Sequence, residues 1–430
     1  MTLVLSSEFP DSHAGHTARR DLFVTLPCRS GCSWPTLDDV RPSPRSRRVS
    51  RNTLRGSASG VDPAEPIDLR SDTVTVPTPE MRQAMADAEV ADDVLDRDPT
   101  MRELEERVAG LLGAADALWT PTGSMANLIA LMSRLGRGES FLAPQGAHVL
   151  DFELGTAAWL AGGMPRPLPH DGGPGKVTGT AVRRAATGDD HYAGLRTSLL
   201  CLENTHNSAG GTVTAPEEHA AVAAAARAAR LAVHLDGARL WNAAVALGVP
   251  PGALTVGADT VSVCLSKGLG APVGSVVAGS AEFVEQARRL RKMLGGGVRQ
   301  GGVVAAAGLV ALEGVDRLAE DHALATTLAA GLRERGWRVR EPQTNIVLVD
   351  VADLRGTIAA FGEAGVRAGV IAGKLRLMTH RDVTEAHVTA ALDRIGEVGP
   401  ASTGSPDGGR SAAFTRPREV PEQAPRTALG

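Results

Sequence analysis

Apolar and polar positions alternate along most of this chain in two periods, one typical of strands and one typical of helices. Between residues 66 and 316, short apolar runs that suit buried strands are separated by segments whose apolar residues recur every three or four positions. The clearest such segment is residues 100–112, with apolar positions at Met101, Leu104, Val108 and Leu111. Strands alternating with helices predict an α/β fold with a large, mostly parallel sheet.

The same patterning predicts a second, smaller unit over residues 317–398. A long helix from about residue 318 is followed by strands near residues 339, 345–351 and 375–380, and then by a last helix over 384–398. This order predicts a C-terminal α+β domain after a large domain at residues 66–316. Arg376 lies inside one of its strands, where a charged side chain needs a partner.

Both ends of the chain lack this periodicity. Residues 1–65 are rich in Ser, Pro and Arg, with a basic run over residues 41–55, and residues 399–430 are rich in Gly, Ser and Pro. Such compositions predict disorder. A nucleic-acid-binding arm is the alternative interpretation of the basic run, while Glu8, Asp11 and Asp21 argue against a transit peptide.

Composition narrows the class of protein. The chain has 45 basic and 49 acidic residues and a net charge of −4, which indicates no nucleic-acid partner for its body. No apolar run reaches the roughly 18 residues that span a bilayer, so we expect no membrane partner and a cytoplasmic protein.

The cysteines predict neither disulfides nor a metal site. Cys201 and Cys264 lie in predicted strands, which favours reduced thiols. Cys28 and Cys32 lack a second pair of metal ligands nearby, so no metal site is predicted.

Polar residues collect where the predicted strands end. Lys267, Asp236 and His148 each follow a short apolar run. Because open α/β sheets gather ligands at the carboxyl edge of their strands, we expect these side chains to lie close together, with the Lys267 amine as a nucleophile. Taken alone, Lys267 could be a surface loop residue, Asp236 a helix cap and His148 a structural histidine.

An anion site is predicted at the same edge. A strand over residues 117–120 ends in a turn that contains Gly123 and Ser124 and leads into a helix over residues 125–135. The free backbone N–H groups and the positive end of the helix dipole at such a turn bind anions. An ordinary turn with a Ser or Thr cap is the alternative, and the spacing fits neither a dinucleotide-binding motif nor a P-loop.

A lysine, an acid, a histidine and an anion site at one sheet edge are the groups that pyridoxal phosphate requires. Its aldehyde needs a lysine, its phosphate a helix N-terminus and its pyridine nitrogen an acidic partner. The region shows neither metal-site spacing nor a Ser/His/Asp triad, which disfavours a hydrolase.

Seven ordered motifs lie between residues 66 and 398. They are Ile67-Asp-Leu-Arg-Ser-Asp-Thr-Val-Thr75, Ala91-Asp-Asp-Val94, Pro121-Thr-Gly-Ser-Met-Ala-Asn-Leu128, Leu202-Glu-Asn-Thr-His-Asn207, His234-Leu-Asp-Gly-Ala-Arg239, Cys264-Leu-Ser-Lys-Gly-Leu-Gly-Ala-Pro-Val-Gly274 and Arg291-Lys-Met-Leu-Gly-Gly-Gly-Val-Arg-Gln300. Together they resemble the low-specificity L-threonine aldolase family. This resemblance implies the aspartate-aminotransferase-like fold type I of pyridoxal-phosphate enzymes.

The resemblance also implies which residues hold the cofactor. They are Gly123, Ser124, His148, Asp236, Arg239, Lys267 and Arg299. Lys267 would carry pyridoxal phosphate as a Schiff base, Asp236 would meet its pyridine nitrogen and His148 would stack on its ring. Gly123 and its neighbour would hold the phosphate. Arg299 would reach the phosphate of a neighbouring subunit's site, which implies a homodimer or homotetramer.

For the substrate, the resemblance implies an amino acid whose carboxylate is bound by Ser71, Arg239 and Arg376. The implied reaction is retro-aldol cleavage of L-threonine or L-allo-threonine to glycine and acetaldehyde. His206 would lie near the β-hydroxyl, and the base that takes its proton is left open between His206 and His148. A β-eliminating lyase or amino-acid racemase of the same fold is the alternative, as is a cofactor-binding protein without catalysis.

Overall fold

The computed structural model describes residues 3–8, 19–24, 65–186 and 192–400, which fall into two units, Met1–Ala58 and Ser59–Gly430. In the first unit, β1 (Leu3–Glu8) pairs antiparallel with β2 (Arg19–Val24). The disorder predicted for residues 1–65 does not anticipate this pair, although each strand contains three consecutive apolar residues. The basic run, Cys28, Cys32 and residues 401–430 lie outside the described residues.

A large sheet organises the second unit. Its seven described strands are, in spatial order, β4 (Asp116–Thr120), β10 (Ser275–Gly279), β9 (Thr260–Cys264), β8 (Ala232–Gly237), β7 (Thr197–Glu203), β5 (Ser140–Pro144) and β6 (Met164–Leu168). All are parallel to one another except β10, which runs antiparallel to both β4 and β9. The predicted α/β fold with a mostly parallel sheet is thus confirmed, although the sequence pattern did not single out β10.

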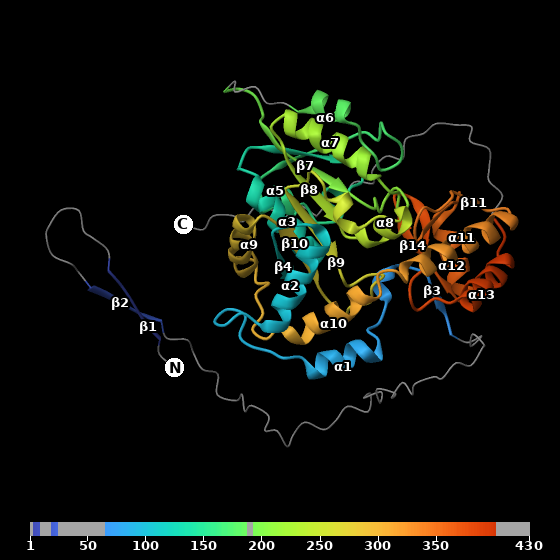
Figure 1. Cartoon of the computed structure of the whole chain (residues 1–430), viewed down its shortest axis with the longest axis horizontal. Helices are drawn as coiled ribbons and strands as arrows, with labels where there is room; N and C mark the ends of the chain where they lie inside the picture. The colour runs from blue at the N-terminus through green and yellow to red at the C-terminus, as the bar shows by residue number, and fades with distance from the viewer. Residues whose placement is uncertain (1–2, 9–18, 25–64, 187–191, 401–430) are drawn as a thin grey trace, which may run out of the picture. The chain divides into compact units, whose positions relative to one another are not determined.

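Helices cover both faces of this sheet (Figure 1). One face packs against α1 (Pro79–Asp87), α2 (Pro99–Leu112), α6 (Gly179–Ala185), α7 (Pro216–Ala228), α8 (Leu240–Leu247), η3 (Pro251–Leu254) and α10 (Gly302–Glu313). The other packs against α3 (Gly123–Arg134), α4 (His148–Asp151), α5 (Thr156–Trp159) and α9 (Ala281–Met293). Along β7, Leu200 and Leu202 face the first layer and Leu199 and Cys201 face the second. Because strand side chains alternate between faces, a strand buried on both sides appears as a continuous apolar run.

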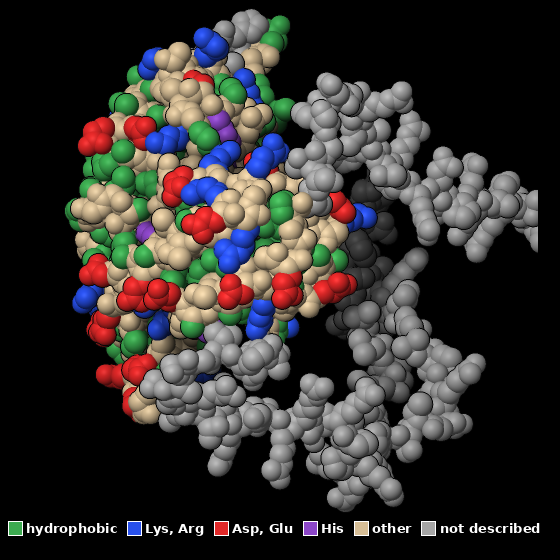
Figure 2. Space-filling model, turned by 90° about the vertical axis from the view of Figure 1, so that its right-hand side faces the viewer, with side chains coloured by type: hydrophobic (Ala, Val, Ile, Leu, Met, Phe, Trp, Pro, Cys, Tyr) green, Lys and Arg blue, Asp and Glu red, His purple; other side chains and the backbone are tan. Residues whose placement is uncertain are grey.

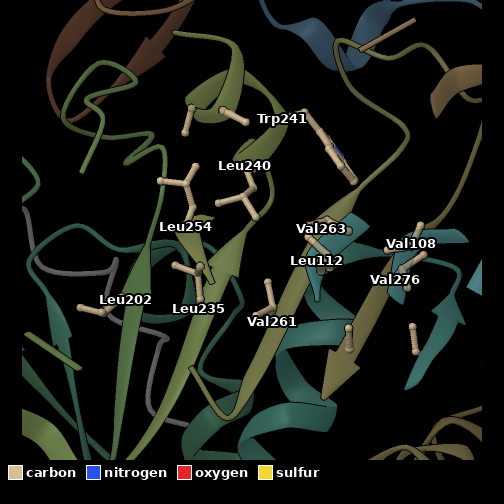
Figure 3. Close-up of a cluster of buried hydrophobic side chains, with 14 of the residues drawn as sticks. Val108, Leu112, Leu202, Leu235, Leu240, Trp241, Leu254, Val261, Val263 and Val276 are labelled. Carbon is tan, nitrogen blue, oxygen red and sulfur yellow. The ribbon is translucent and has the colours of Figure 1, made fainter. Parts of the chain in front are cut away.

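The first of these cores is built from aliphatic side chains. Figure 3 shows Leu202, Leu235, Val261 and Val263 of three adjacent strands beside helix residues such as Leu112. With aromatic residues at 3% of the chain, burial of many Leu, Val and Ala side chains provides the hydrophobic free energy, at about 25 cal/mol per Å² of apolar surface.

A smaller sheet lies at the C-terminal end of this unit. Its strands, in spatial order, are β11 (Arg338–Val339), β12 (Ile346–Asp350), β15 (Lys374–Met378) and β14 (Gly369–Ile371). The covering helices are α11 (Leu318–Glu334), α12 (Leu354–Glu363) and α13 (Glu385–Gly396).

Figure 2 shows one face of the molecule, on which acidic and basic side chains are interspersed.

The start of the folded body belongs with this smaller sheet. The strand β3 (Ile67–Asp68) pairs in parallel with β13 (Val366–Arg367), and Ile67 and Leu69 are buried in the core formed by α11, α13 and β12. The predicted division at residue 316 does not anticipate this pairing, because a two-residue strand carries no periodicity. None of the helices in the described ranges is long and apolar enough to cross a membrane.

Candidate active site

A cavity of about 340 Å³ opens at the carboxyl edge of the large sheet. Such a volume is within the usual range for small-molecule sites. Six of the residues predicted for the site line it, namely Gly123, Ser124, His148, Asp236, Arg239 and Lys267. The carboxyl ends of β4, β5, β8 and β9 therefore bring these groups to one edge, although only β8 and β9 are neighbours in the sheet.

The N-terminus of α3 forms one wall of the cavity. Thr122 caps the helix by accepting a hydrogen bond from the Met125 N–H at 3.1 Å, and no described residue accepts from the N–H groups of Gly123 and Ser124. A Cβ on Gly123 would lie 2.9 Å from Cys264 Sγ, so a side chain there would collide with the end of β9. Two free N–H donors at the positive end of a helix provide the predicted anion site.

Asp236 lies at the base of the cavity and is held by two donors. Its Oδ2 accepts from Asn127 Nδ2 at 2.8 Å, and its Oδ1 accepts from the Ala238 N–H at 3.0 Å. Asn127, on α3, also accepts from Ser262 and donates to Glu153. The carboxylate is 2% exposed, so its orientation is determined by these contacts.

His148 is held at both its backbone and its ring. Its N–H donates to Glu203 Oε2 at 2.7 Å, and its ring Nδ1 lies 2.8 Å from Glu153 Oε1. Burial by itself would lower the pKa of His148, but the hydrogen bond to Glu153 and the charges of Asp236 and Glu153 outweigh it and raise that pKa. The histidine at the cavity wall therefore binds a proton more readily than a free imidazole does.

Lys267 lies in the glycine-containing loop between β9 and β10 and lines the cavity. Its carbonyl accepts from Thr75 Oγ1 at 2.9 Å and from the Gly270 N–H at 2.8 Å. A Cβ on Gly268 would lie 2.8 Å from Leu318, so the loop packs closely against α11. These contacts hold the backbone of Lys267 while its amine has no described hydrogen-bond partner.

Arg239 forms a buried ion pair that the sequence did not predict. Its Nε and Nη2 donate to the two carboxylate oxygens of Asp72 at 2.7 and 2.6 Å. Asp72 is fully buried and also accepts from Asn345. Burial by itself would raise the pKa of Asp72, but the Arg239 charge keeps it well below its ordinary value. The bidentate face of Arg239 that was expected to bind substrate is thus occupied by Asp72.

Arg376 and Arg239 donate hydrogen bonds to the same acceptor, the side-chain oxygen of Asn207. The Oδ1 of Asn207, a cavity residue, accepts from Arg376 Nη1 at 3.2 Å and from Arg239 Nη1 at 3.3 Å. Burial and the nearby Arg239 charge lower the pKa of Arg376 to about 10, so it stays protonated at neutral pH. Of the described carboxylates, only Asp72 bonds directly to these two guanidinium groups, while Glu203 of the cavity wall interacts with Arg239 through charge alone. Arg376 has no described carboxylate bonded to it, which favours binding of an anion there.

Four predicted site residues do not line this cavity, namely Arg376, which reaches it through the lining residue Asn207, and His206, Ser71 and Arg299. His206 is buried, and its ring packs edge-on against His170 with centroids 5.2 Å apart. Ser71 accepts hydrogen bonds from Thr73, which does line the cavity. Arg299 is mostly exposed and pairs with Asp92 at 3.0 Å. Their predicted roles stay predictions.

Sequence reasoning also missed residues that contact the predicted ones, chiefly Asp72, Asn127 and Glu153. Asp72 and Asn127 lie inside quoted motifs, so their positions carried a signal, although nothing in their spacing indicated a partner. Glu153 lies five residues after His148 in the turn between α4 and α5, and only the fold turns it back onto the histidine. His148, Glu153 and Asp236 have ligand atoms within 4.8 Å of one another. His148 bonds to Glu153, and both carboxylates accept from Asn127, which favours a hydrogen-bonded network over a metal site.

Comparison with known proteins agrees with this geometry. The sequence model of the beta-eliminating lyase family matches residues 68–354. Low-specificity L-threonine aldolase 1 of Arabidopsis thaliana is 42% identical over 341 residues, which cover 76% of this chain and 94% of that protein. Low specificity L-threonine aldolase of Escherichia coli K12 is 42% identical over 322 residues, which cover 74% of this chain and 95% of that protein.

Solved structures of lower identity share the fold. The threonine aldolase of Leishmania major superposes with a TM-score of 0.65 at 21% identity, covering 77% of this chain and all of that one. A serine palmitoyltransferase of Sphingomonas wittichii gives 0.61 at 17% identity, covering 78% of this chain and 89% of that one. The chain belongs to the beta-eliminating lyase family and, within it, to the low-specificity L-threonine aldolases.

Proposed function

We propose that this protein is a pyridoxal-phosphate-dependent lyase that cleaves L-threonine, L-allo-threonine and related β-hydroxy-α-amino acids to glycine and an aldehyde. The observation that carries the proposal is the convergence of a nucleophilic lysine, a buried acid and a helix N-terminus on one cavity. The relatives named as threonine aldolases, which match almost over their whole length, support the choice of substrate.

The cavity fits pyridoxal phosphate on three separate observations. The unpaired N–H groups of Gly123 and Ser124 suit its phosphate, the buried Asp236 carboxylate suits its pyridinium nitrogen, and the Lys267 amine suits its aldehyde. Absence of a side chain at Gly123 leaves the space beside Cys264 open for the phosphate. When bound, pyridoxal phosphate accepts the electron pair of the breaking Cα–Cβ bond into its ring.

The arginine side of the cavity would hold the substrate carboxylate. Arg376 carries a positive charge that Asp72 does not compensate, and Asn207 Oδ1 lies where an anionic oxygen could replace it between the two arginines. We assign the carboxylate mainly to Arg376, with Arg239 contributing its remaining N–H donor. A carboxylate fixed at this end restricts rotation about the Cα bonds, so the bond to be broken can be held perpendicular to the cofactor plane.

His148 is the better candidate for the base that takes the β-hydroxyl proton. It lines the cavity and its Nδ1 is bound to Glu153, which leaves Nε2 for the substrate. His206 does not line the cavity, and burial lowers its pKa. We assign the proton transfer to His148 Nε2, directly or through a water molecule.

The assembly and location of the protein are also proposed on family grounds. The proposal is a homodimer or homotetramer in the cytoplasm, and it rests on the resemblance to bacterial threonine aldolases such as that of Escherichia coli K12. Arg299, exposed on a loop beside Asp92, is then free to reach the cofactor phosphate of a neighbouring subunit. Glycine formation from threonine would be the metabolic role.

An absorbance spectrum followed by product analysis tests the proposal. The purified protein should show the visible absorbance of lysine-bound pyridoxal phosphate, and added L-threonine should yield acetaldehyde and glycine in equal amounts. Release of 2-oxobutanoate and ammonia from L-threonine would assign the chain to a β-eliminating reaction. Inverted substrate would assign it to a racemase, and absence of the absorbance after cofactor addition would refute the cofactor itself.

A further inference from the structure

Two acidic side chains and one amide form a continuous hydrogen-bonded chain behind the cavity. His148 Nδ1 lies 2.8 Å from Glu153 Oε1, which also accepts from Asn127 Nδ2 at 2.8 Å. The same Asn127 Nδ2 donates to Asp236 Oδ2 at 2.8 Å. The histidine on one side of the site is therefore joined to the acid at its base through two intervening residues.

The orientation of Asn127 is determined by four contacts. Its Oδ1 accepts from Ser262 Oγ at 2.7 Å and from His234 Nε2 at 3.1 Å, so its Nδ2 must point toward the two carboxylates. Glu153 and Asn127 are 5% and 2% exposed. Buried polar groups with every partner present restrict one another to a single arrangement.

We infer that Glu153, held by Asn127, is a positioning residue for the proposed reaction: it keeps His148 Nδ1 as a donor and His148 Nε2 as the atom that accepts the substrate proton. The inference rests on the proposed function. Two contacts support this role: Glu153 Oε1 lies within hydrogen-bond distance of His148 Nδ1, and Asn127 donates to both Glu153 and Asp236.

The charges around His148 explain what Glu153 adds. The groups that face the ring are Glu153 from the turn after α4, Asp236 from β8 and Lys267 from the loop after β9, while Glu203 from β7 holds the backbone. Asp236 would be engaged by the pyridine nitrogen when the cofactor is bound. Burial raises the pKa of Glu153, and its hydrogen bonds to His148 and Asn127 oppose that rise by favouring the charged form. Glu153 is then the carboxylate left to stabilise a positive charge on His148 as the proton arrives.

Glu153→Gln tests this role because the amide keeps the shape and an acceptor oxygen but removes the charge. In the holoenzyme, the protonation midpoint of His148 should fall by about one pH unit. It is measured by NMR of histidine labelled at Cε1, with the His148 signal identified by its absence in His148→Asn. The acidic limb of the pH profile of kcat/KM for L-threonine should move in the same direction by a similar amount.

Two further variants separate positioning from general structural damage. Asp151→Asn makes the same chemical change two residues away on the exposed side of α4 and should leave the midpoint unchanged. Glu153→Asp keeps the charge and should retain most of the raised midpoint even if kcat falls.

The NMR midpoint of His148 tests the positioning role of Glu153, and the acetaldehyde assay tests the proposed reaction independently of it. A His148 midpoint within about 0.2 pH units of wild type in Glu153→Gln, or an equal fall in Glu153→Asp and Glu153→Gln, would overturn the positioning role. If wild type releases no acetaldehyde but the NMR midpoint shifts as expected, the proposed reaction fails while the Glu153–His148 pair stands.

Discussion

The cofactor side of the active site is built from neighbouring strand ends of one sheet, whereas the arginine side joins segments that are far apart in the chain. Asp236 lies near the end of β8, and Lys267 follows the adjacent strand β9. Arg239 and Asp72, by contrast, are 167 residues apart, and Arg376 is 169 residues from Asn207. The first side depends on the order of strands in the sheet, and the second on how the N-terminal segment and the smaller sheet pack against it.

The two sides also carry opposite charge. The cofactor side offers the carboxylates of Asp236 and Glu153 beside His148, while the arginine side offers two guanidinium groups against the single carboxylate of Asp72. A cationic pyridinium suits the first and a substrate carboxylate suits the second. The division implies that changes on one side alter cofactor chemistry and changes on the other alter substrate binding and stability.

The largest effect is expected on the cofactor side at Lys267. Lys267→Ala should abolish the visible absorbance of the bound cofactor and lower kcat by at least about 1,000-fold, because no other described lysine lines the cavity. Absorbance spectra and the acetaldehyde assay measure both quantities. Lys292→Ala, at an exposed position on α9, is the matched control, and a Lys267→Ala protein that keeps both signals would refute the assignment.

On the arginine side, Asp72→Asn should cause the largest loss of stability. It leaves Arg239 buried without its counter-charge, which costs about 3–5 kcal/mol of unfolding free energy. Urea unfolding of both proteins measures the difference. Asp68→Asn makes the same change in the partly exposed pair with Arg70 and should cost less than about 1 kcal/mol. Equal losses in the two variants would contradict the buried-pair interpretation.

Arg376→Ala should separate substrate binding from cofactor binding. Loss of a charge-assisted contact to the substrate carboxylate should raise KM for L-threonine by roughly 10- to 100-fold and lower kcat, while the cofactor absorbance stays unchanged. Steady-state kinetics and spectra measure both. Arg367→Ala, at a half-exposed position on β13, is the control, and kinetics like those of wild type in Arg376→Ala would remove it from the site.

The last prediction concerns how the free energy of unfolding depends on pH on the two sides of the site. Burial lowers the pKa of His234, which donates to Asn127 behind the cofactor side, to about 4. Its folded-state pKa is below the unfolded value of about 6.5, so the stability it contributes is complete above pH 6.5 and is lost as pH falls toward 4, by about 2–3 kcal/mol. Asp72, whose pKa lies well below its ordinary value, stays ionised throughout this window.

Urea midpoints at pH 7 and pH 4.5 measure that loss. His234→Gln keeps a donor for Asn127 without a titrating group, so it should lose less stability between the two pH values than wild type. The buried His219 and the partly buried His322, whose pKa values burial also lowers, are present in both proteins and cancel in the comparison. An identical loss in wild type and His234→Gln would show that His234 does not contribute.

The sequence by itself determined the fold class and most of the cofactor side. Short apolar runs located the buried strands, and parallel strands bring their carboxyl ends to one edge, so Lys267, Asp236, His148 and the Gly123 turn could be placed together before any coordinates. Periodicity is a local property, so the ends of the strands that it predicts carry over directly into the structure.

Only the tertiary structure decided which groups pair inside the site. The Asp72–Arg239 ion pair, the Glu153 contact to His148 and the pairing of β3 with β13 all depend on packing between segments whose spacing has no period. A buried charge takes whichever opposite charge the fold brings within reach, because its desolvation must be compensated. For that reason Arg239, expected to face the substrate, is bound bidentately to Asp72, and Arg376 carries the uncompensated charge.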